Sequence, residues 1–170
     1  MPRPSAACHS GPVATRIDYV DDPHAPAPNS LVPSVNCVVE NEAGEILLIE
    51  RSDNGNWSLP GGAMDLGESV ADAAVRETLE ETGVLVEVTG LVGIYTDPRH
   101  VVHYTSNDEI RQEFSIVFAG RPLSGDPTPS DESSKVSWVA PSDLGLYRMH
   151  GSMRQRLAHY LERSPIPYIR

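Results

Sequence analysis

The most constraining feature of this chain is a turn of proline and glycine followed by a helix with glutamates concentrated near its end. Leu59-Pro60-Gly61-Gly62 imposes an irregular backbone, because proline fixes φ and glycine permits conformations that other residues avoid. A helix then begins at Glu68 or Ser69 and runs to Thr82, with Gly83 as its C-terminal cap. The segment predicts a loop–helix unit whose backbone can approach a ligand closely.

This predicted helix has two different faces. On a helical wheel one face, which we expect to pack on a sheet, consists of Ala71, Ala74, Val75, Thr78, Leu79 and Thr82. Glu77, Glu80 and Glu81 project from the opposite side. The helix dipole and mutual repulsion disfavour carboxylates there, each by about a few tenths of a kcal/mol. A divalent cation would reverse these penalties, since hard cations take oxygen ligands, whereas the alternative is a solvated acidic face.

The spacing of the whole segment narrows these alternatives. Gly62, Glu68 and the run Arg76-Glu77-Thr78-Leu79-Glu80-Glu81-Thr82-Gly83 resemble the Nudix box, a glycine, glutamate and Arg-Glu…Glu-Glu-x-Gly pattern. One departure is Thr78, where the family usually has an aliphatic residue, and its methyl group can still face the core. Trp138 and Pro141-Ser142-Asp143-Leu144 resemble the family's late strand and turn, so the resemblance covers roughly residues 35–144.

The resemblance implies both a fold and an activity. The fold is α/β (α+β), the Nudix-type α/β/α sandwich with a central mixed β-sheet. The activity is that of a MutT-like or ADP-ribose pyrophosphatase-like Nudix hydrolase. Such an enzyme uses magnesium, with manganese as a substitute, to cleave a diphosphate bond in ADP-ribose, a nucleoside triphosphate or a related nucleotide. The alternative is a catalytically silent Nudix-fold module that only binds a nucleotide, which usually lacks a box carboxylate.

The resemblance also implies roles for the residues of the box. Glu77, Glu80 and Glu81 are the expected metal ligands, with the Gly61 carbonyl as a further ligand and Glu68 acting from the loop junction, directly or through water. Glu77 is in addition the candidate base for the attacking water. Magnesium suits a site built only from oxygen atoms.

Arg76 completes the expected catalytic set with Glu77 and Glu81. It can pair with Asp72 or Glu80 at a spacing of four residues and so orient the carboxylates. Partners of this kind hold metal ligands in a productive geometry.

Candidate substrate contacts lie outside the box. Aromatic and basic residues gather between Tyr95 and Arg111, where they can stack on a base and hold phosphates or form a mobile loop of mixed polarity. We expect the substrate-binding residues to be Arg51, Tyr95, Arg99, Arg111 and Glu113. Glu113 is preferred over Glu132 as an additional acidic ligand or base, and a zinc site at His100 and His103 is not expected because no third ligand lies nearby.

The remaining pattern predicts a single domain behind an N-terminal arm. Prolines in residues 1–33 predict an extended arm, and residues 34–170 form the expected Nudix hydrolase domain. Strands are predicted at Val35–Val39, Ile46–Ile49, Val84–Ile94, Glu113–Ala119 and Val136–Val139, the first two as a hairpin, with a loop at Pro122–Ser134 and a closing helix at Met153–Arg163. This order predicts a mixed sheet with helices on its faces.

Composition excludes several functional classes. The net charge of −11 disfavours a nucleic acid polymer as partner, whereas a small nucleotide diphosphate substrate is allowed once metal ions mask its charge. Cys8 and Cys37 make no disulfide framework, and we find no apolar run of membrane-spanning length and no signal peptide. We therefore expect a cytoplasmic protein without a membrane partner. The oligomeric state stays open, with a homodimer as one alternative.

Overall fold

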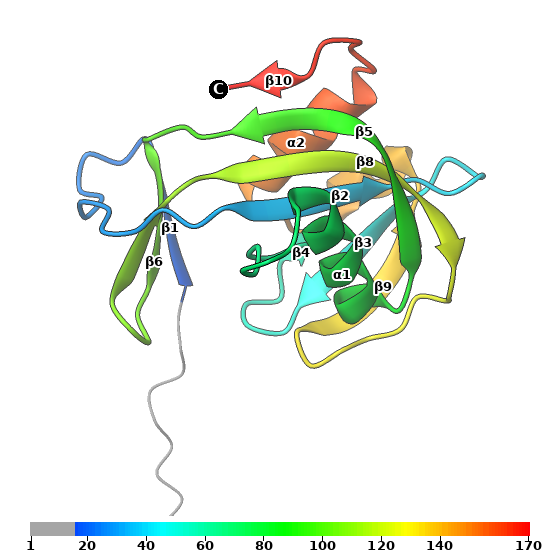
Figure 1. Ribbon diagram of the computed structural model, residues 1–170, viewed down its shortest axis with the longest axis horizontal. Helices are drawn as coiled ribbons and strands as arrows, with labels where there is room; N and C mark the ends of the chain where they lie inside the picture. Colours follow the sequence, from blue (N-terminus) through cyan, green and yellow to red (C-terminus); the bar gives the residue numbers. More distant parts are fainter. Residues whose placement is uncertain (1–15) are drawn as a thin grey trace, which may run out of the picture.

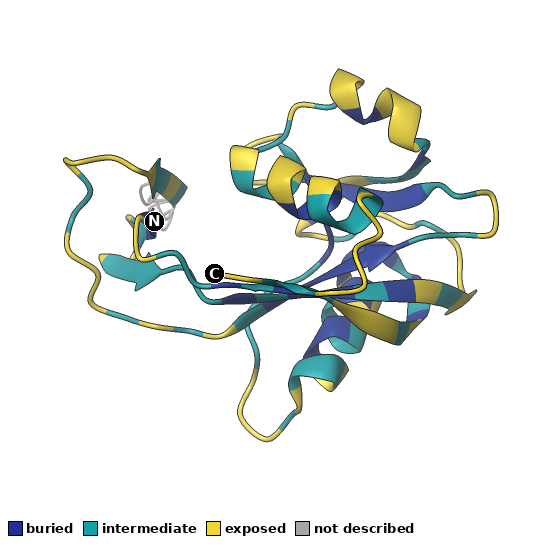
Figure 2. Cartoon of the chain, turned by 90° about the horizontal axis from the view of Figure 1, so that it is seen from above, coloured by how far each residue is buried: buried dark blue, intermediate teal, exposed yellow. Residues whose placement is uncertain are grey.

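The computed structural model describes residues 16–170, which form three β-sheets, two α-helices and a short 3-10 helix (Figure 1). Seen from above, helical segments lie on both sides of the sheet layer and turn their exposed faces outward (Figure 2). This arrangement confirms the predicted α/β/α sandwich.

The largest sheet is mixed, as predicted. It contains β2 (Ser34–Val39), β5 (Leu85–Tyr95), β8 (Ser115–Ser124) and β10 (Tyr168–Ile169), in the order β10-β5-β8-β2. β5 and β8 are antiparallel, whereas β2 runs parallel to β8 and β10 runs parallel to β5. β2 is buried from Val35 to Val39, because α1 and α2 cover the two faces of the sheet.

The second sheet corrects the predicted hairpin. It contains β3 (Ile46–Arg51), β4 (Trp57–Ser58) and β9 (Ser133–Val139), in the order β4-β3-β9. The turn at 41–45 does form, yet beyond a single bridge between Glu40 and Ile46 the two strands diverge into different sheets. The hairpin prediction was wrong because alternation and turn residues identify strands, whereas burial of both faces of β2 selects β8 as its partner.

The third sheet was not predicted. It contains β1 (Arg16–Val20), β6 (His100–Tyr104) and β7 (Glu109–Gln112), and β6 pairs antiparallel with both neighbours. Residues 16–20 of the expected arm are therefore one strand of this sheet, since they contain no proline and every backbone N–H can enter the ladder. Residues 1–15 of that arm lie outside the described part of the chain.

Helix α1 (Val70–Thr82) has the predicted ends. Ser69 and Asp72 form a capping box, and Gly83 closes the helix at φ 72°. The buried face of the helix is rotated relative to the predicted face. Leu79 is 43% exposed, whereas Ala73 and Glu81 are buried.

Two threonines lie on the buried face, as predicted. Thr78 Oγ1 donates to the Ala74 carbonyl at 2.7 Å, and Thr82 Oγ1 donates to the Thr78 carbonyl. Both hydroxyls are satisfied within the helix, so both residues are fully buried without an unpaired polar group. The buried face of the helix also carries Glu81.

Helix α2 (Gly151–Leu161) and the 3-10 helix η1 (Pro141–Leu146) complete the fold. α2 begins two residues earlier than predicted, since His150 caps its first turn by accepting from the Ser152 backbone N–H. β8 extends to Ser124, into the predicted loop at 122–134. No helix among residues 16–170 is long and apolar enough to cross a membrane.

Candidate active site

The glycine turn is pressed directly against α1. Gly61 has φ 148°, and a Cβ there would lie 2.0 Å from the Val35 carbonyl oxygen. A Cβ on Gly62 would lie 2.6 Å from the carboxylate of Glu77. Gly61 therefore excludes any other residue, whereas a larger residue at Gly62 would have to displace the Glu77 carboxylate. The Gly61 N–H donates to Glu81 Oε2 at 2.8 Å.

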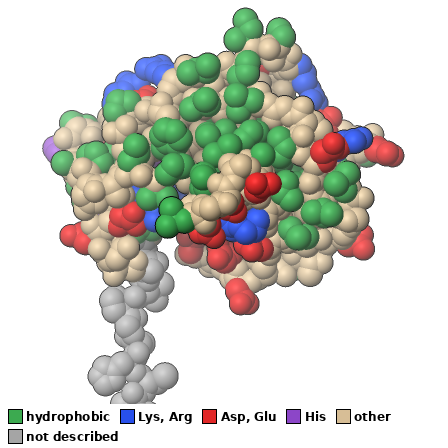
Figure 3. Space-filling view, viewed as in Figure 1, with side chains coloured by type: hydrophobic (Ala, Val, Ile, Leu, Met, Phe, Trp, Pro, Cys, Tyr) green, Lys and Arg blue, Asp and Glu red, His purple; other side chains and the backbone are tan. Residues whose placement is uncertain are grey.

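The three box carboxylates differ sharply in their exposure. Glu81 is 4% exposed, the Glu77 side chain is 14% exposed, and the Glu80 side chain is 60% exposed. Together with Ser130, Asp131 and Glu132 they line a concavity of about 220 Å³. On the face shown in Figure 3, acidic side chains and a few cations gather over α1 and the turn before it, below a broad apolar region.

Burial raises the pKa of both inner carboxyls. Desolvation raises the pKa of Glu81 to about 7, the Gly61 N–H opposes this shift, and the charges of Glu77 and Glu132 add to it. Desolvation also raises the pKa of Glu77, although Arg76 lowers it. Several carboxylates thus converge in a partly buried space without enough positive charge, which is the electrostatic condition that a divalent cation relieves.

The donor set fits a hard cation. Besides the carboxylates, one backbone carbonyl is left for a ligand: Pro60 and Gly62 accept hydrogen bonds from Cys37 and Val35 of β2. Within residues 16–170, the Gly61 carbonyl accepts no hydrogen bond. All the available donors are oxygen atoms, which magnesium and manganese prefer.

Arg76 holds the outer carboxylates in place. Its guanidinium donates to both oxygens of Glu68 at 2.7 and 3.0 Å, to Glu77 at 2.9 Å and to Glu80 at 3.1 Å. Of the two expected partners it thus selects Glu80, because Asp72 belongs to the capping box. Glu68 lies before the helix and also accepts from the Asp65 N–H, so the structure places it beside Arg76 and not in the 220 Å³ concavity.

A second cleft adjoins this concavity. It has a volume of about 230 Å³, and its lining includes the candidate residues Arg51, Arg111 and Glu113 as well as Gly62 and Glu132. Glu132 lines both spaces, and a Cβ on Gly62 would touch Glu77. A ligand extended along the cleft would therefore reach the carboxylates of α1.

Comparison with known proteins agrees with this arrangement. The family model described as NUDIX domain matches residues 30–162. The chain belongs to the Nudix hydrolase family.

Relatives and solved structures extend the comparison. A MutT-like protein of Streptomyces ambofaciens is 37% identical over 74% of this chain and 75% of its own length. A putative 8-oxo-dGTP diphosphatase of Bacillus subtilis is 37% identical over 69% of this chain and 72% of its own. The crystal structure of a Nudix hydrolase from Nitrosomonas europaea superimposes with a TM-score of 0.67 at 25% identity, covering 84% of this chain and 80% of that one. The protein is therefore an enzyme of the Nudix hydrolase class.

Two of the expected substrate-binding residues, Tyr95 and Arg99, lie outside the 230 Å³ cleft. Tyr95 is 3% exposed, stacks on Tyr168 and places its hydroxyl 2.9 Å from His159 Nδ1. Its ring is part of the core and has no free face for a base. Arg99 pairs with Asp97 and Asp21 at the start of β6, beside a different hollow. The stretch 95–112 is a strand end and a hairpin, so its side chains separate onto different surfaces.

The sequence favoured Glu113 over Glu132 as an additional acidic ligand or base, and the contacts of the two residues favour the opposite order. Glu113 is already neutralised by Arg156 at 2.6 Å and by His100 at 3.2 Å. Burial would raise the pKa of Glu113, yet these partners lower it overall. Glu132 lines the concavity of the α1 carboxylates, and its charge raises the pKa of Glu77 and Glu81. The geometry thus favours Glu132 as the additional acidic ligand and leaves Glu113 on the cleft wall.

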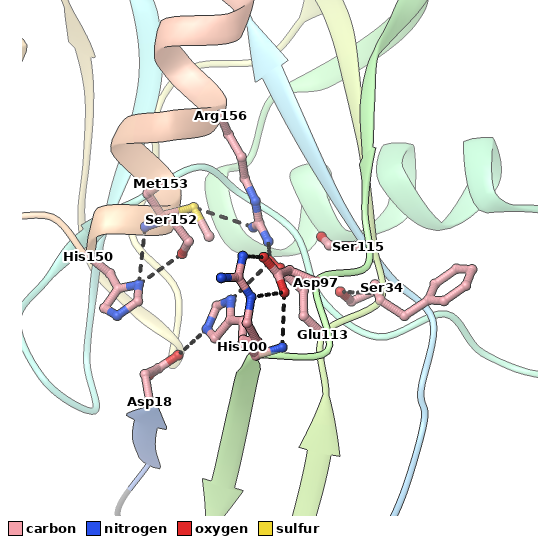
Figure 4. A network of polar contacts seen from close by, with 12 residues as sticks. Asp18, Ser34, Asp97, His100, Glu113, Ser115, His150, Ser152, Met153 and Arg156 are labelled. Carbon is pink, nitrogen blue, oxygen red and sulfur yellow. Dashed lines mark hydrogen bonds and ion pairs between the residues drawn. The ribbon is translucent and has the colours of Figure 1, made fainter. Parts of the chain in front are cut away.

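Sequence reasoning missed a buried ionic network behind the cleft (Figure 4). Asp18, His100, Glu113 and Arg156 come from β1, β6, the segment before β8 and α2, and successive partners lie 2.6 to 3.2 Å apart. Desolvation would lower the pKa of His100, but the two carboxylates raise it to about 9. No signal in the sequence connects residues so far apart.

The same network includes a group with metal-ligand chemistry. Ligand atoms of Asp18, His100 and His150 all lie within 4.8 Å of one another. Both ring nitrogens of His100 already contact carboxylates, and Arg16 holds both oxygens of Asp18. A cation there would have to displace a proton from His100 beside a guanidinium, so we assign these residues to the wall and not to a metal site.

Proposed function

We propose that this Nudix enzyme uses magnesium to hydrolyse a diphosphate bond in a nucleotide. The observation that carries the proposal is the convergence of Glu77, Glu81 and Glu132 in one partly buried concavity beside the Gly61 backbone. Burial and mutual repulsion raise the pKa of the first two carboxyls. A bound cation would satisfy this site, and a surface face of glutamates would not need such burial.

Each residue has a task in this proposal. Glu77, Glu80, Glu81 and the Gly61 carbonyl hold the metal, and Glu132 adds a ligand from the facing loop. The metal supplies charge neutralisation of the diphosphate and a more acidic water. Glu77 takes the proton from the attacking water, since its carboxyl is held by Arg76 and its pKa is raised toward the working range of a base. Arg76 fixes the orientation of the carboxylates.

The substrate class is supported by the cleft and by the relatives. Arg51 and Arg111 line the cleft beside the metal concavity, where guanidinium groups suit phosphate oxygens. The relatives include a protein named putative 8-oxo-dGTP diphosphatase, an ADP-ribose pyrophosphatase of Methanocaldococcus jannaschii and a nucleoside triphosphatase of Salmonella. All these names refer to nucleotides with a diphosphate linkage, and we propose the same class for this chain.

The test is a hydrolysis panel with the purified protein and magnesium. It includes ADP-ribose, NADH, nucleotide sugars, dinucleoside polyphosphates and canonical and oxidised nucleoside triphosphates, with products separated by chromatography. We expect turnover of one class and a loss of about 10³-fold or more in kcat for Glu81→Gln, which keeps the shape but removes a metal ligand. Glu87→Gln on the exposed part of β5 is the matched control and keeps full activity.

The same experiment distinguishes a hydrolase from a silent binding module. Such a module would bind a nucleotide and magnesium without turnover of any compound. Full activity of Glu81→Gln would instead show that the metal ligands are assigned wrongly. Either result would remove the support that the buried carboxylates give to the proposal.

A further inference from the structure

The N-terminal strand β1 contributes to the substrate cleft although it precedes the region that matches the family. That region begins at residue 30, whereas Arg16 on β1 lines the cleft together with Arg51 and Arg111. We propose that Arg16 and Arg111 form an anion subsite, which binds a phosphoryl group other than the two joined by the scissile bond. This inference rests on the proposed function and identifies nucleoside polyphosphates as the preferred class.

Arg16 is held rigidly toward the cleft. Its Nε and Nη2 donate to the two oxygens of Asp18 at 2.9 and 2.8 Å. Asp18 in turn contacts His100 at 3.2 Å, and His100 contacts Glu113. Charges alternate along this chain and continue to Arg156 of α2, so β1 is attached to the body of the domain at this point. Asp18 and His100 are thus positioning residues for the Arg16 guanidinium.

The two arginines at this end of the cleft are held in the same way. Arg111 is held by bidentate hydrogen bonds to Glu109, two residues before it, just as Arg16 is held by Asp18, two residues after it. Glu109 raises the pKa of Arg111, and the nearby charge of Arg16 opposes part of this shift, so the two guanidiniums lie within electrostatic reach of each other. Their side chains are 23% and 29% exposed, which leaves donor groups accessible from the cleft. Paired guanidiniums in a concave site are typical of phosphate binding.

The subsite suits an anion better than a nucleobase. The Arg111 guanidinium lies over the Tyr104 ring at 4.7 Å from its centroid, so this ring face is covered. The cleft meets the metal concavity at Glu132. A diphosphate bound by metal at the α1 end would therefore direct its next phosphoryl group toward Arg16 and Arg111.

The test measures binding without turnover. Calorimetry in magnesium uses two probes: methylenediphosphonate, which carries only the two phosphoryl groups of the scissile unit, and α,β-methylene-ATP, which carries a third. We expect Arg16→Ala to weaken α,β-methylene-ATP about tenfold or more and methylenediphosphonate less than about twofold. The matched control is Arg121→Ala, since Arg121 is an exposed arginine paired with Glu87 outside the cleft, and it should leave both affinities unchanged.

Thermal unfolding of each variant shows whether the fold is kept. If Arg16→Ala does not fold, Arg111→Ala on the other strand replaces it, with the same expected loss. Unchanged affinity of the folded variant for α,β-methylene-ATP would overturn the subsite. Equal weakening of both probes would also overturn it, because the effect would then lie at the scissile unit. Failure of wild-type protein to bind methylenediphosphonate with magnesium would count against the proposed function instead.

Discussion

At the residue scale, the site depends on close contacts between the glycine turn, β2 and α1. Gly61 and Gly62 bring backbone to within contact of Val35 and Glu77, and the Gly61 N–H fixes one oxygen of Glu81. The carboxylates thus have a defined place before any cation binds. Preorganisation of this kind is what metal-assisted catalysis requires of the protein.

A single methyl group at Gly62 should therefore impair catalysis. In Gly62→Ala the new Cβ would meet the Glu77 carboxylate at 2.6 Å, so the side chain must move. We expect kcat to fall about a hundredfold, the size of effect that a displacement of about 1 Å produces. Gly145→Ala is the control, because nothing lies within 4 Å of the added atom. Steady-state kinetics on the substrate found by the panel measures both, and normal kcat in Gly62→Ala would contradict the geometry.

The raised pKa of Glu81 predicts that the metal-free protein loses stability as the pH rises, and that magnesium offsets this loss. The folded pKa of about 7 lies above the ordinary value of 4.5, so the metal-free folded state binds more protons between these pH values. Its stability must then fall as pH rises from about 4.5 to 7, by up to about 3 kcal/mol from this group. Glu81→Gln lacks this loss and should be more stable than wild type at pH 8 in a chelator.

Urea unfolding at pH 5 and pH 8, with and without magnesium, tests this expectation. Magnesium should stabilise wild type more at pH 8 than at pH 5, since the ion binds the ionised carboxylates. Glu87→Gln serves as the exposed control. A metal-free difference between wild type and Glu81→Gln that does not change with pH would show that Glu81 titrates normally.

At the scale of elements, one histidine adds charged side-chain contacts to the backbone pairing of β1 with β6. His100 of β6 lies between Asp18 of β1 and Glu113, and these carboxylates raise its pKa to about 9 against the desolvation that would lower it. A histidine with a raised pKa contributes stability that is fully present below about pH 6.5. This contribution is lost as pH rises through about 9.

Amide hydrogen exchange can follow this element directly. We expect the backbone amides of 16–20 to lose protection between pH 7 and pH 10, after correction for the intrinsic rate. His100→Gln should show the same weak protection already at pH 7, because the uncharged amide cannot replace the imidazolium between two carboxylates. His103→Gln on the same strand is the control, since the ion pair of His103 in the described part of the chain is with the exposed Asp108. Equal protection in wild type and His100→Gln would refute the role.

At the scale of the whole molecule, Arg156 connects the layers. Its side chain is 5% exposed and donates from α2 to Asn36 of β2 and to Glu113, the residue that holds His100. One guanidinium thereby links α2, the mixed sheet and the third sheet. Its Nε is the one buried side-chain polar atom without a partner among the described residues.

Removing this guanidinium should destabilise the entire fold. Arg156→Met leaves the buried Glu113 without its strongest partner, and we expect a loss of about 3–5 kcal/mol in the free energy of unfolding. Arg154→Met is the matched control on the same helix, because among residues 16–170 Arg154 donates to the backbone carbonyls of Leu144 and Tyr147 and pairs with no carboxylate. Urea unfolding at pH 7 measures both variants. A loss below about 1 kcal/mol for Arg156→Met would mean that the network contributes little.

The sequence by itself determined the parts of this protein that follow local rules. The helix start near Ser69, the Gly83 cap and the spacing of Glu77, Glu80 and Glu81 depend on helical geometry within one segment, and they were predictable to within a residue or two. The resemblance of that segment then led to the family and to the sandwich fold. The substrate contacts remained predictions, because an arginine or tyrosine has the same local pattern on a cleft wall as in the core.

Only the tertiary structure decided which distant segments meet. It paired β2 with β8, buried Tyr95, brought Glu132 beside the carboxylates of α1 and placed Arg16 in the cleft. These outcomes depend on how both faces of each sheet are covered and on where charges find partners across the chain. Neither quantity is a property of a short segment, since a strand's period of two residues states which side chains share a face but not what that face will contact.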